Sequence, residues 1–250
     1  MKTSAPQKRF YRGLIHHKDI HSRTIAVSET DLQIGTDRPV DVRFVEARIR
    51  QYRRQIQAYI IKDRKFLHSL KPIAVELTAP PIIKQMARAG SLAGVGPMAS
   101  VAGAIAQFLG RDLLRKGYKD VIIENGGDIF IKSRRTRLVG IYAGKHQLWN
   151  KIAIAIKPRQ TPLGVCTSSG RLGHSVSFGD ADGVVILAKN ASVADAAATA
   201  VANTVNSSSD LPQAIARGRL IRGVRGIVVI FRENLAVWGD VKLQNSPLRF

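Results

Sequence analysis

The chain has 250 residues, of which 45% are hydrophobic, and it carries a formal net charge of +21 at pH 7. Its single cysteine excludes an internal disulfide framework, and no apolar run reaches the length of a membrane span. The charge favours anionic partners, but the few aromatic residues and the absence of zinc-finger spacing argue against a dedicated nucleic-acid-binding module. The amino terminus is basic and lacks the apolar segment of a secretory signal, so we expect a soluble cytoplasmic protein.

The first quarter of the chain predicts short strands followed by a long helix. Residues 9–15, 23–29 and 31–36 have the composition of strands separated by polar breaks. Residues 41–63 carry an apolar stripe at steps of four and three, which predicts an amphipathic helix. The stripe consists of Val45, Ile49, Tyr52, Ile56 and Tyr59. The arginines on the rest of this helix form either a solvated face or a surface for an anionic partner.

A glycine-rich segment, residues 90–96, separates two further predicted helices, over 81–89 and 97–116. Gly94 and Gly96 precede the second helix, and a glycine loop before a helix N-terminus can hold phosphate through free backbone N–H groups. The spacing matches neither a Walker loop nor a dinucleotide-binding fingerprint. Ordinary packing of helices through small residues is therefore an equal alternative.

A double glycine separates two predicted strands, over residues 119–125 and 129–133. The residues at the break are Asn125, Gly126, Gly127 and Asp128. Two glycines between strands indicate a turn, a bulge, or a ligand held against the backbone. The aspartate after them either orients a ligand or a metal-bound water, or it caps the turn.

The remaining elements complete an α+β pattern. They are a charged hairpin connection over 132–137, strands over 138–144, 151–157 and 184–188, a short helix over 211–217, and a terminal hairpin over 225–243 that turns at Glu233–Asn234. Strand pairs that flank a few helices predict an α+β fold with mainly antiparallel sheets. We expect residues 1–250 to form a single domain, with two subdomains as the alternative.

Residues 164–205 hold most of the candidate site residues. Cys166 is followed by the hydroxyl cluster Thr167, Ser168 and Ser169. A reactive thiol needs nearby positive groups and access, whereas a lone cysteine on a strand is more often a small buried residue. His174, in the glycine-punctuated loop that follows, is either a general acid or base or a histidine that bonds only to backbone.

An alanine-rich helix closes this stretch. Asp195 and Thr199 stand four residues apart and therefore stack on one helix face. A carboxylate next to a hydroxyl offers two oxygen ligands that suit Mg²⁺. The alternative is a capping box, in which Ser192 and Asp195 serve only the start of the helix.

Five segments, in this order, resemble an uncharacterised family described as ApbE-like: GVGPMASVAGAIA, ENGGDIFI, PLGVCTSSG, GHSVSFG and ADAAATAVANTV. The resemblance runs from about Phe10 to the C-terminus. This family resembles, more distantly, the ApbE flavin transferases, which use Mg²⁺ and FAD to attach FMN to a threonine or serine of a target protein. The resemblance implies a fold related to the tunnelling fold, an anionic nucleotide ligand (FAD or FMN), and a protein acceptor or a metabolic partner protein.

The resemblance also assigns roles to residues. It places the transferases' glycine turn at Gly126, Gly127 and Asp128, their T-S-G segment at Thr167 to Gly170 with one inserted serine, their metal-ligating aspartate and threonine at Asp195 and Thr199, and their catalytic histidine near His174. The sequence is compatible with a homo-oligomer.

Two departures from the transferase pattern bear on function. Ala102-Gly103 stands where the transferases have a lysine-glycine pair, and SVSFGDADG follows His174 in place of their D-P-x-T-G segment. Nucleotide binding can therefore persist without flavin transfer. The family's link to sulfide assimilation and homocysteine formation gives a second hypothesis, a non-catalytic binding or assembly protein in which Cys166 would matter. A basic nucleic-acid-binding module is the third.

Overall fold

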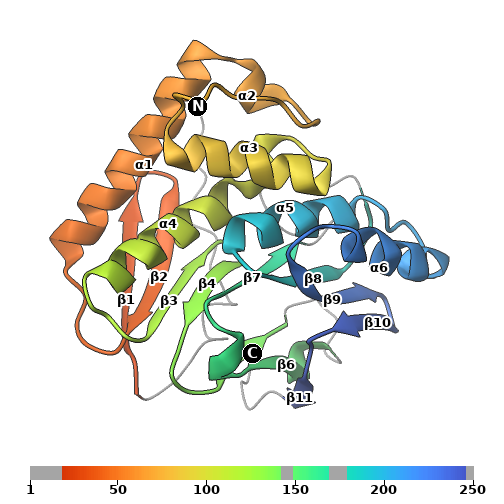
Figure 1. The fold of residues 1–250 in the computed structure, drawn as a ribbon. Helices are drawn as coiled ribbons and strands as arrows, with labels where there is room; N and C mark the ends of the chain where they lie inside the picture. The colour runs from red at the N-terminus through yellow and green to blue at the C-terminus, as the bar shows by residue number, and fades with distance from the viewer. Residues whose placement is uncertain (1–18, 142–148, 169–178, 246–250) are drawn as a thin grey trace.

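Eight strands form one antiparallel sheet in the computed structural model, which describes residues 19–141, 149–168 and 179–245 (Figure 1). The strand order is β1-β2-β3-β4-β7-β8-β9-β10, and each neighbouring pair is antiparallel. The strands are β1 His21–Val27, β2 Thr30–Thr36, β3 Val121–Asn125, β4 Asp128–Lys132, β7 Leu163–Ser168, β8 Gly183–Ala188, β9 Val224–Phe231 and β10 Asn234–Gly239. The predicted α+β class with mainly antiparallel sheets is confirmed.

A smaller sheet lies on one face of the large one. It has the order β11-β6-β5 and consists of β5 Arg137–Gly140, β6 Ile152–Ile156 and β11 Leu243–Asn245. Buried apolar side chains from both sheets pack together between them. They include Ile122, Ile131 and Val185 of the large sheet and Ile154 and Ile156 of the small one.

The prediction of a hairpin connection over 132–137 is wrong. β4 pairs with β3 and β7, whereas β5 pairs with β6, so this tract crosses from the large sheet to the small one. One of its charges is buried and paired, because Arg137 donates to both carboxylate oxygens of Asp19 at 2.8 and 3.0 Å, whereas Arg134 and Arg135 form ion pairs but stay mostly exposed. Arg134 similarly donates to Asp120.

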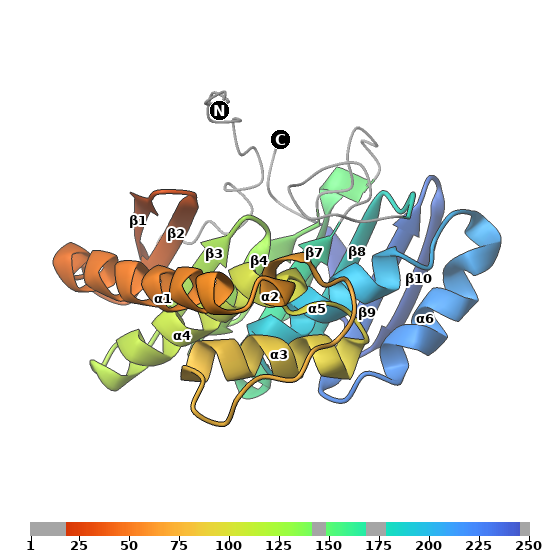
Figure 2. The same cartoon turned by 90° about the horizontal axis from the view of Figure 1, so that it is seen from above.

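Helices cover the other face of the large sheet (Figures 1 and 2). They are α1 Val42–Lys62, α2 Lys65–His68, α3 Pro81–Ala93, α4 Val101–Arg115, α5 Ala191–Ala202 and α6 Leu211–Arg219. The α4 helix packs on β3 and β4, and α5 packs on β7 and β8. Because α5 also contacts α3 and α4, it is buried in the middle of the helical layer.

Local sequence signals predicted most of these helices. All five residues of the apolar stripe in α1 are buried, and Asp41 caps that helix by accepting from the Phe44 N–H. The α3 helix runs four residues further than predicted, through Gly90, where any side chain would meet the Val95 carbonyl oxygen. The helix expected from Pro97 begins with a 3₁₀ turn, η2 Pro97–Ser100, before α4.

The predicted terminal hairpin forms between β9 and β10, but its second strand ends at Gly239 instead of Leu243, which belongs to β11 of the small sheet. The turn also differs from the prediction. Phe231 pairs with Asn234, so the two turn residues are Arg232 and Glu233 rather than Glu233 and Asn234. The strand expected over 9–15 lies outside the described residues. In the part of the chain that the structure covers, no single helix has the length and apolar character of a membrane span. Only α3 taken together with η2 and α4 has that length and composition, and these helices are bent by 103° at the break between them.

Candidate functional site

The double glycine forms a tight turn between β3 and β4. Asn125 pairs with Asp128, so Gly126 and Gly127 are the two turn residues, with φ of 68° and 104°. Two positive φ values in a two-residue hairpin turn favour glycine, which adopts them without steric strain. The Gly127 N–H donates to Glu124 Oε1 at 2.8 Å, which fixes the turn from one side.

The outer surface of this turn is open. Among the described residues, a side chain added at Gly126 would meet nothing within 4 Å, and one added at Gly127 would meet only the Thr167 carbonyl oxygen at 3.4 Å. A molecule can therefore approach the backbone closely here. The turn itself is as predicted, and its role in binding stays a prediction.

Strand register brings three candidate residues into one row on the helix-covered face. Asn125 lies opposite Asp128, and Asp128 lies opposite Cys166, so their side chains share a face of the sheet. The Asn125 side chain donates to the Ala102 carbonyl oxygen of α4 at 3.1 Å. The row therefore meets the first turn of α4.

The hydroxyl cluster does not act as one unit. Because side chains alternate along a strand, Ser168 shares the face of Cys166, whereas Thr167 lies on the opposite face with Leu163 and Val165. The Ser168 hydroxyl is buried and has no hydrogen-bond partner within the described part of the chain. Ser169 and His174 lie outside the described residues, so the structure assigns them no position.

Asp195 joins α5 to α4. Its Oδ2 accepts from the Gly103 N–H at 2.9 Å, in the first turn of α4, a helix that lacks a side-chain cap from Ser100. The capping-box alternative is wrong, because the α5 cap is Asn190, whose side chain accepts from the Val193 N–H at 2.9 Å. Asp195 thus caps a neighbouring helix rather than its own.

The site concentrates negative charge in a buried place. Burial raises the pKa of Asp128 well above its usual range, and the charges of Asp195 and Glu124 raise it further. Burial also raises the pKa of Asp195 to about 7, against the opposing effect of the Gly103 and Ala102 N–H groups. Carboxylates held together in this way lose affinity for their protons when a cation binds between them.

The oxygen atoms of Asp195 and Thr199 could hold a magnesium ion whose remaining ligands are water or phosphate oxygens. Asp195 offers a carboxylate and Thr199, one helical turn further along, is 7% exposed and offers a hydroxyl. Within the residues that the structure describes, no group of three or more His, Cys, Asp or Glu side chains could hold a metal ion by itself. Mg²⁺ commonly binds through one or two carboxylates together with water and ligand phosphates, so this sparse set suits it better than a closed protein cage.

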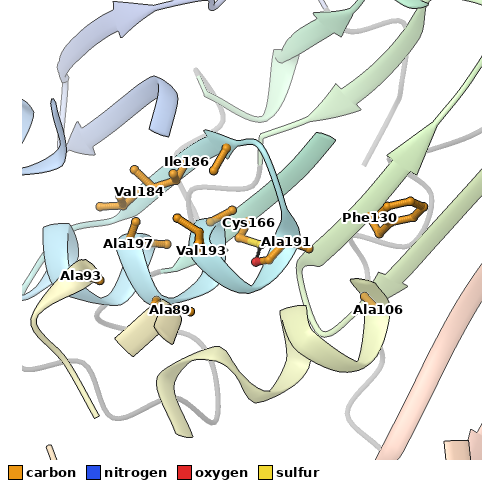
Figure 3. Packing of buried hydrophobic residues seen from close by; sticks show 14 of the residues in the cluster. Ala89, Ala93, Ala106, Phe130, Cys166, Val184, Ile186, Ala191, Val193 and Ala197 are labelled. Atoms are coloured by element: carbon orange, nitrogen blue, oxygen red, sulfur yellow. Dashed lines mark hydrogen bonds between the residues drawn. The ribbon is translucent and has the colours of Figure 1, made fainter. Parts of the chain in front are cut away.

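Cys166 is buried in the apolar layer below α5 (Figure 3). Its Sγ donates to the Ala191 carbonyl oxygen at 3.3 Å. Burial raises the pKa of the thiol well above its usual range, and the nearby Asp128 and Asp195 charges raise it further. These surroundings favour a small buried residue over a reactive thiol.

The two loop glycines have packing roles. Gly94 ends α3 in a left-handed conformation, with φ of 73°. A side chain at Gly96 would collide with the backbone of Ser69. The hydrogen bonds from α4 to the site come instead from Ala102 and Gly103, which the sequence singled out only as a departure from the transferase pattern.

Comparison with other sequences identifies relatives along most of the chain. The model of a family described as AbpE bacteria matches residues 12–221. A UPF0280 protein of Methanococcus aeolicus is 39% identical over 226 residues, which cover 89% of this chain and 91% of the relative. A UPF0280 protein of Methanosarcina acetivorans is 36% identical over 223 residues, which cover 88% of each chain.

Solved structures show the same fold. The flavin transferase ApbE from Vibrio cholerae is similar with a TM-score of 0.57 and 13% identity, over 88% of this chain and 96% of that one. The ApbE protein from Thermotoga maritima is similar with a TM-score of 0.58 and 12% identity, over 88% of this chain and 96% of that one. At these identities the likeness concerns the fold, and the resemblance expected from the motifs is confirmed.

Proposed function

The chain belongs to the AbpE bacteria family and shares its fold with the flavin transferase ApbE from Vibrio cholerae. We propose that it binds a flavin nucleotide, FAD or FMN, together with Mg²⁺ beside the glycine turn. The observation that carries the proposal is the convergence of Asp128 and Asp195 at the first turn of α4. Two neighbouring buried carboxyl groups are costly to ionise, and a divalent cation bound between them lowers that cost. A nucleotide diphosphate is a natural further ligand of such a cation.

Different residues would bind the metal ion and the nucleotide. Asp195 and Thr199 would supply oxygen ligands, and the ion would neutralise a diphosphate and act on it as a Lewis acid. The Ser168 hydroxyl, buried and without a partner among the described residues, is available to a ligand oxygen. The absence of side chains at Gly126 and Gly127 leaves room for the ligand at the backbone.

Flavin transfer would need more than binding. In such a step the acceptor hydroxyl oxygen bonds to the FMN phosphorus, the P–O bond to the AMP half of FAD breaks, AMP leaves with the bridging oxygen, and a base takes the hydroxyl proton. The base that the resemblance suggests is His174, whose following segment departs from the transferase pattern. Ala102 also removes the positive charge that a lysine would offer to the transferring phosphate. We therefore propose nucleotide binding with slow or absent transfer.

Calorimetric titration tests the binding site. The metal-stripped protein is titrated with FAD in the presence and absence of Mg²⁺, and Asp195→Asn is compared with Asp63→Asn, a matched change at the end of α1. We expect Mg²⁺-dependent binding in the parent and the control and its loss in Asp195→Asn. Equal affinity in all three proteins would remove Asp195 from the site. Failure to bind any flavin or adenine nucleotide would favour the assembly-protein hypothesis.

Mass spectrometry tests the transfer step separately. The protein, FAD and Mg²⁺ are incubated with a peptide that carries a transferase target sequence, and the peptide is examined for added FMN. We expect little or none. Robust flavinylation that disappears in His174→Ala would show that transfer survives the two sequence departures.

A further inference from the structure

A cavity of about 480 Å³ lies where the large sheet meets the small one, away from the glycine turn. Its walls come from β6, from the 3₁₀ turn η4 Pro158–Gln160, from the start of β9, and from the segment that follows β10. Asp128 lies on β4, and β9 is the third strand along the sheet from it, after β7 and β8. The two strands are therefore roughly 14 Å apart at the usual strand spacing. The cavity is therefore separate from the candidate flavin site.

The walls of this cavity carry a strong positive charge. Lys157, Arg159, Arg225 and Lys242 line it, against the single carboxylate of Asp240. Among the described residues, none of the four basic side chains forms an ion pair with an aspartate or glutamate. The stretches outside the described ranges contain no Asp or Glu, so the rest of the chain offers no acidic side chain either. The mutual repulsion of these charges falls when an anion binds among them.

A β-bulge directs one of these side chains. Leu187 pairs with Gly226 and Ala188 pairs with Val224, so Arg225 is the extra residue between them. Bulges bend a strand and re-aim a side chain, and they are common next to binding sites. Here the Arg225 Nη1 reaches the Gln160 carbonyl oxygen at 3.4 Å, at the wall of the cavity.

Hydrogen bonds join η4, the start of β9 and the segment after β10, which are three of the four wall segments. The Asp240 N–H donates to the Arg225 carbonyl oxygen at 2.8 Å, and the Gln160 side chain donates to the Asp240 carbonyl oxygen at 3.3 Å. The Gln160 side-chain oxygen accepts from the Lys157 N–H at 2.7 Å. The basic side chains therefore extend from a backbone framework that is already in place before a ligand arrives.

We propose that this cavity is a second binding site, for a small anion that carries two linked phosphate groups, either free diphosphate or a diphosphate ester. Its volume falls within the usual range for small-molecule pockets, but its lining is charged rather than apolar. Arginine and lysine together match such a ligand, since arginine binds phosphate oxygens in a fork and lysine binds them as a point charge. The site differs from the flavin site in needing no metal ion.

Titration with inorganic pyrophosphate in the presence of a chelator tests the proposal, because the chelator removes the cation that the flavin site requires. The variant is Lys157→Gln/Lys242→Gln, which removes two charges from the cavity. The control is Lys71→Gln/Lys119→Gln, which lowers the net charge equally at exposed positions elsewhere. We expect the parent and the control to bind pyrophosphate, and the cavity variant to bind it at least about tenfold more weakly, because it loses contacts between charged groups. A parallel titration with ADP distinguishes free diphosphate from an ester.

Two results would overturn the proposal. One is a parent protein that does not bind pyrophosphate or ADP under these conditions. The other is an equal loss in the cavity variant and the control, which would mean that the anion responds only to the overall charge of the protein. Circular dichroism of both variants verifies that they fold, and their unchanged Mg²⁺-dependent titration with FAD would show that the two sites are independent.

Discussion

Replacing Asp195 by asparagine is expected to stabilise the metal-free protein at neutral and alkaline pH. Burial raises the pKa of this carboxyl from 3.8 to about 7 in the folded chain. The folded state therefore holds the proton more tightly than the unfolded chain does, and the free energy of unfolding falls as the pH rises from about 4 to about 7. At about 1.4 kcal/mol for each pKa unit, the upper limit of this loss is about 4 kcal/mol.

Asparagine cannot ionise but keeps an oxygen for the Gly103 N–H. The difference in unfolding free energy between variant and parent should therefore move in favour of the variant by about 1 to 3 kcal/mol between about pH 5 and about pH 8. Urea unfolding followed by circular dichroism, with a chelator present, measures it. At the upper pH, Mg²⁺ should stabilise the parent and not the variant, because only the parent gains a ligand in its folded state. A difference that stays constant with pH would refute this account of Asp195.

Three further predictions concern other residues. Gly127→Val, at a φ of 104° that a β-branched residue resists, should lose FAD binding in calorimetry; a folded variant that binds normally would make the turn purely structural. Cys166 should react with iodoacetamide much more slowly in the native protein than in urea at about pH 8, since burial raises the pKa of its thiol, and rapid native labelling would contradict this. Asp19→Asn should lower the free energy of unfolding by about 1 to 3 kcal/mol at neutral pH, because it breaks the paired hydrogen bonds to the buried Arg137. These bonds lower the pKa of Asp19 to about 2, so its contribution is present above about pH 4 and is lost as the pH falls toward 2, and a urea titration series that gives no such trend would contradict the pairing.

The parts of the fold that the sequence predicts are those that depend on local pattern. The stripe of α1 is predicted because its residues recur with the helical period, and the structure buries all five of them. The division into two sheets is not predictable in this way, because it depends on which distant strand pairs with which. The tract 132–137 has the polar composition of a hairpin turn, but β5 finds its partner in β6. The ion pair between Asp19 and the buried Arg137 then replaces the solvation that the composition suggests for that residue, while Arg134 pairs with Asp120 at the surface.

In the candidate site too, local features are predictable from the sequence and contacts between distant elements are not. Two glycines and an aspartate are enough to predict the turn after β3, and the four-residue spacing predicts that Asp195 and Thr199 share a face. The contact between Asp195 and the first turn of α4 depends on how two helices pack, and spacing along one helix cannot reveal it. Gly103 is the available signal, because a side chain there would collide with the Ala191 carbonyl oxygen of α5.

The charge balance of the site explains why metal and nucleotide should bind together. Within the described residues, neither Asp128 nor Asp195 forms an ion pair with a lysine or arginine, and Ala102 stands where the transferases place a lysine. A diphosphate brought to these two carboxyl groups would find no lysine or arginine paired with them among the described residues, so a divalent cation would supply the compensation that a side chain could partly provide elsewhere. The same cation would lower the pKa values of both carboxyl groups and release their protons. FAD binding should therefore take place with proton release at neutral pH. Calorimetry in buffers of different ionisation enthalpy measures the number of protons released. Binding without Mg²⁺, or without proton release, would show that a positive group elsewhere in the chain balances the charge of Asp128 and Asp195.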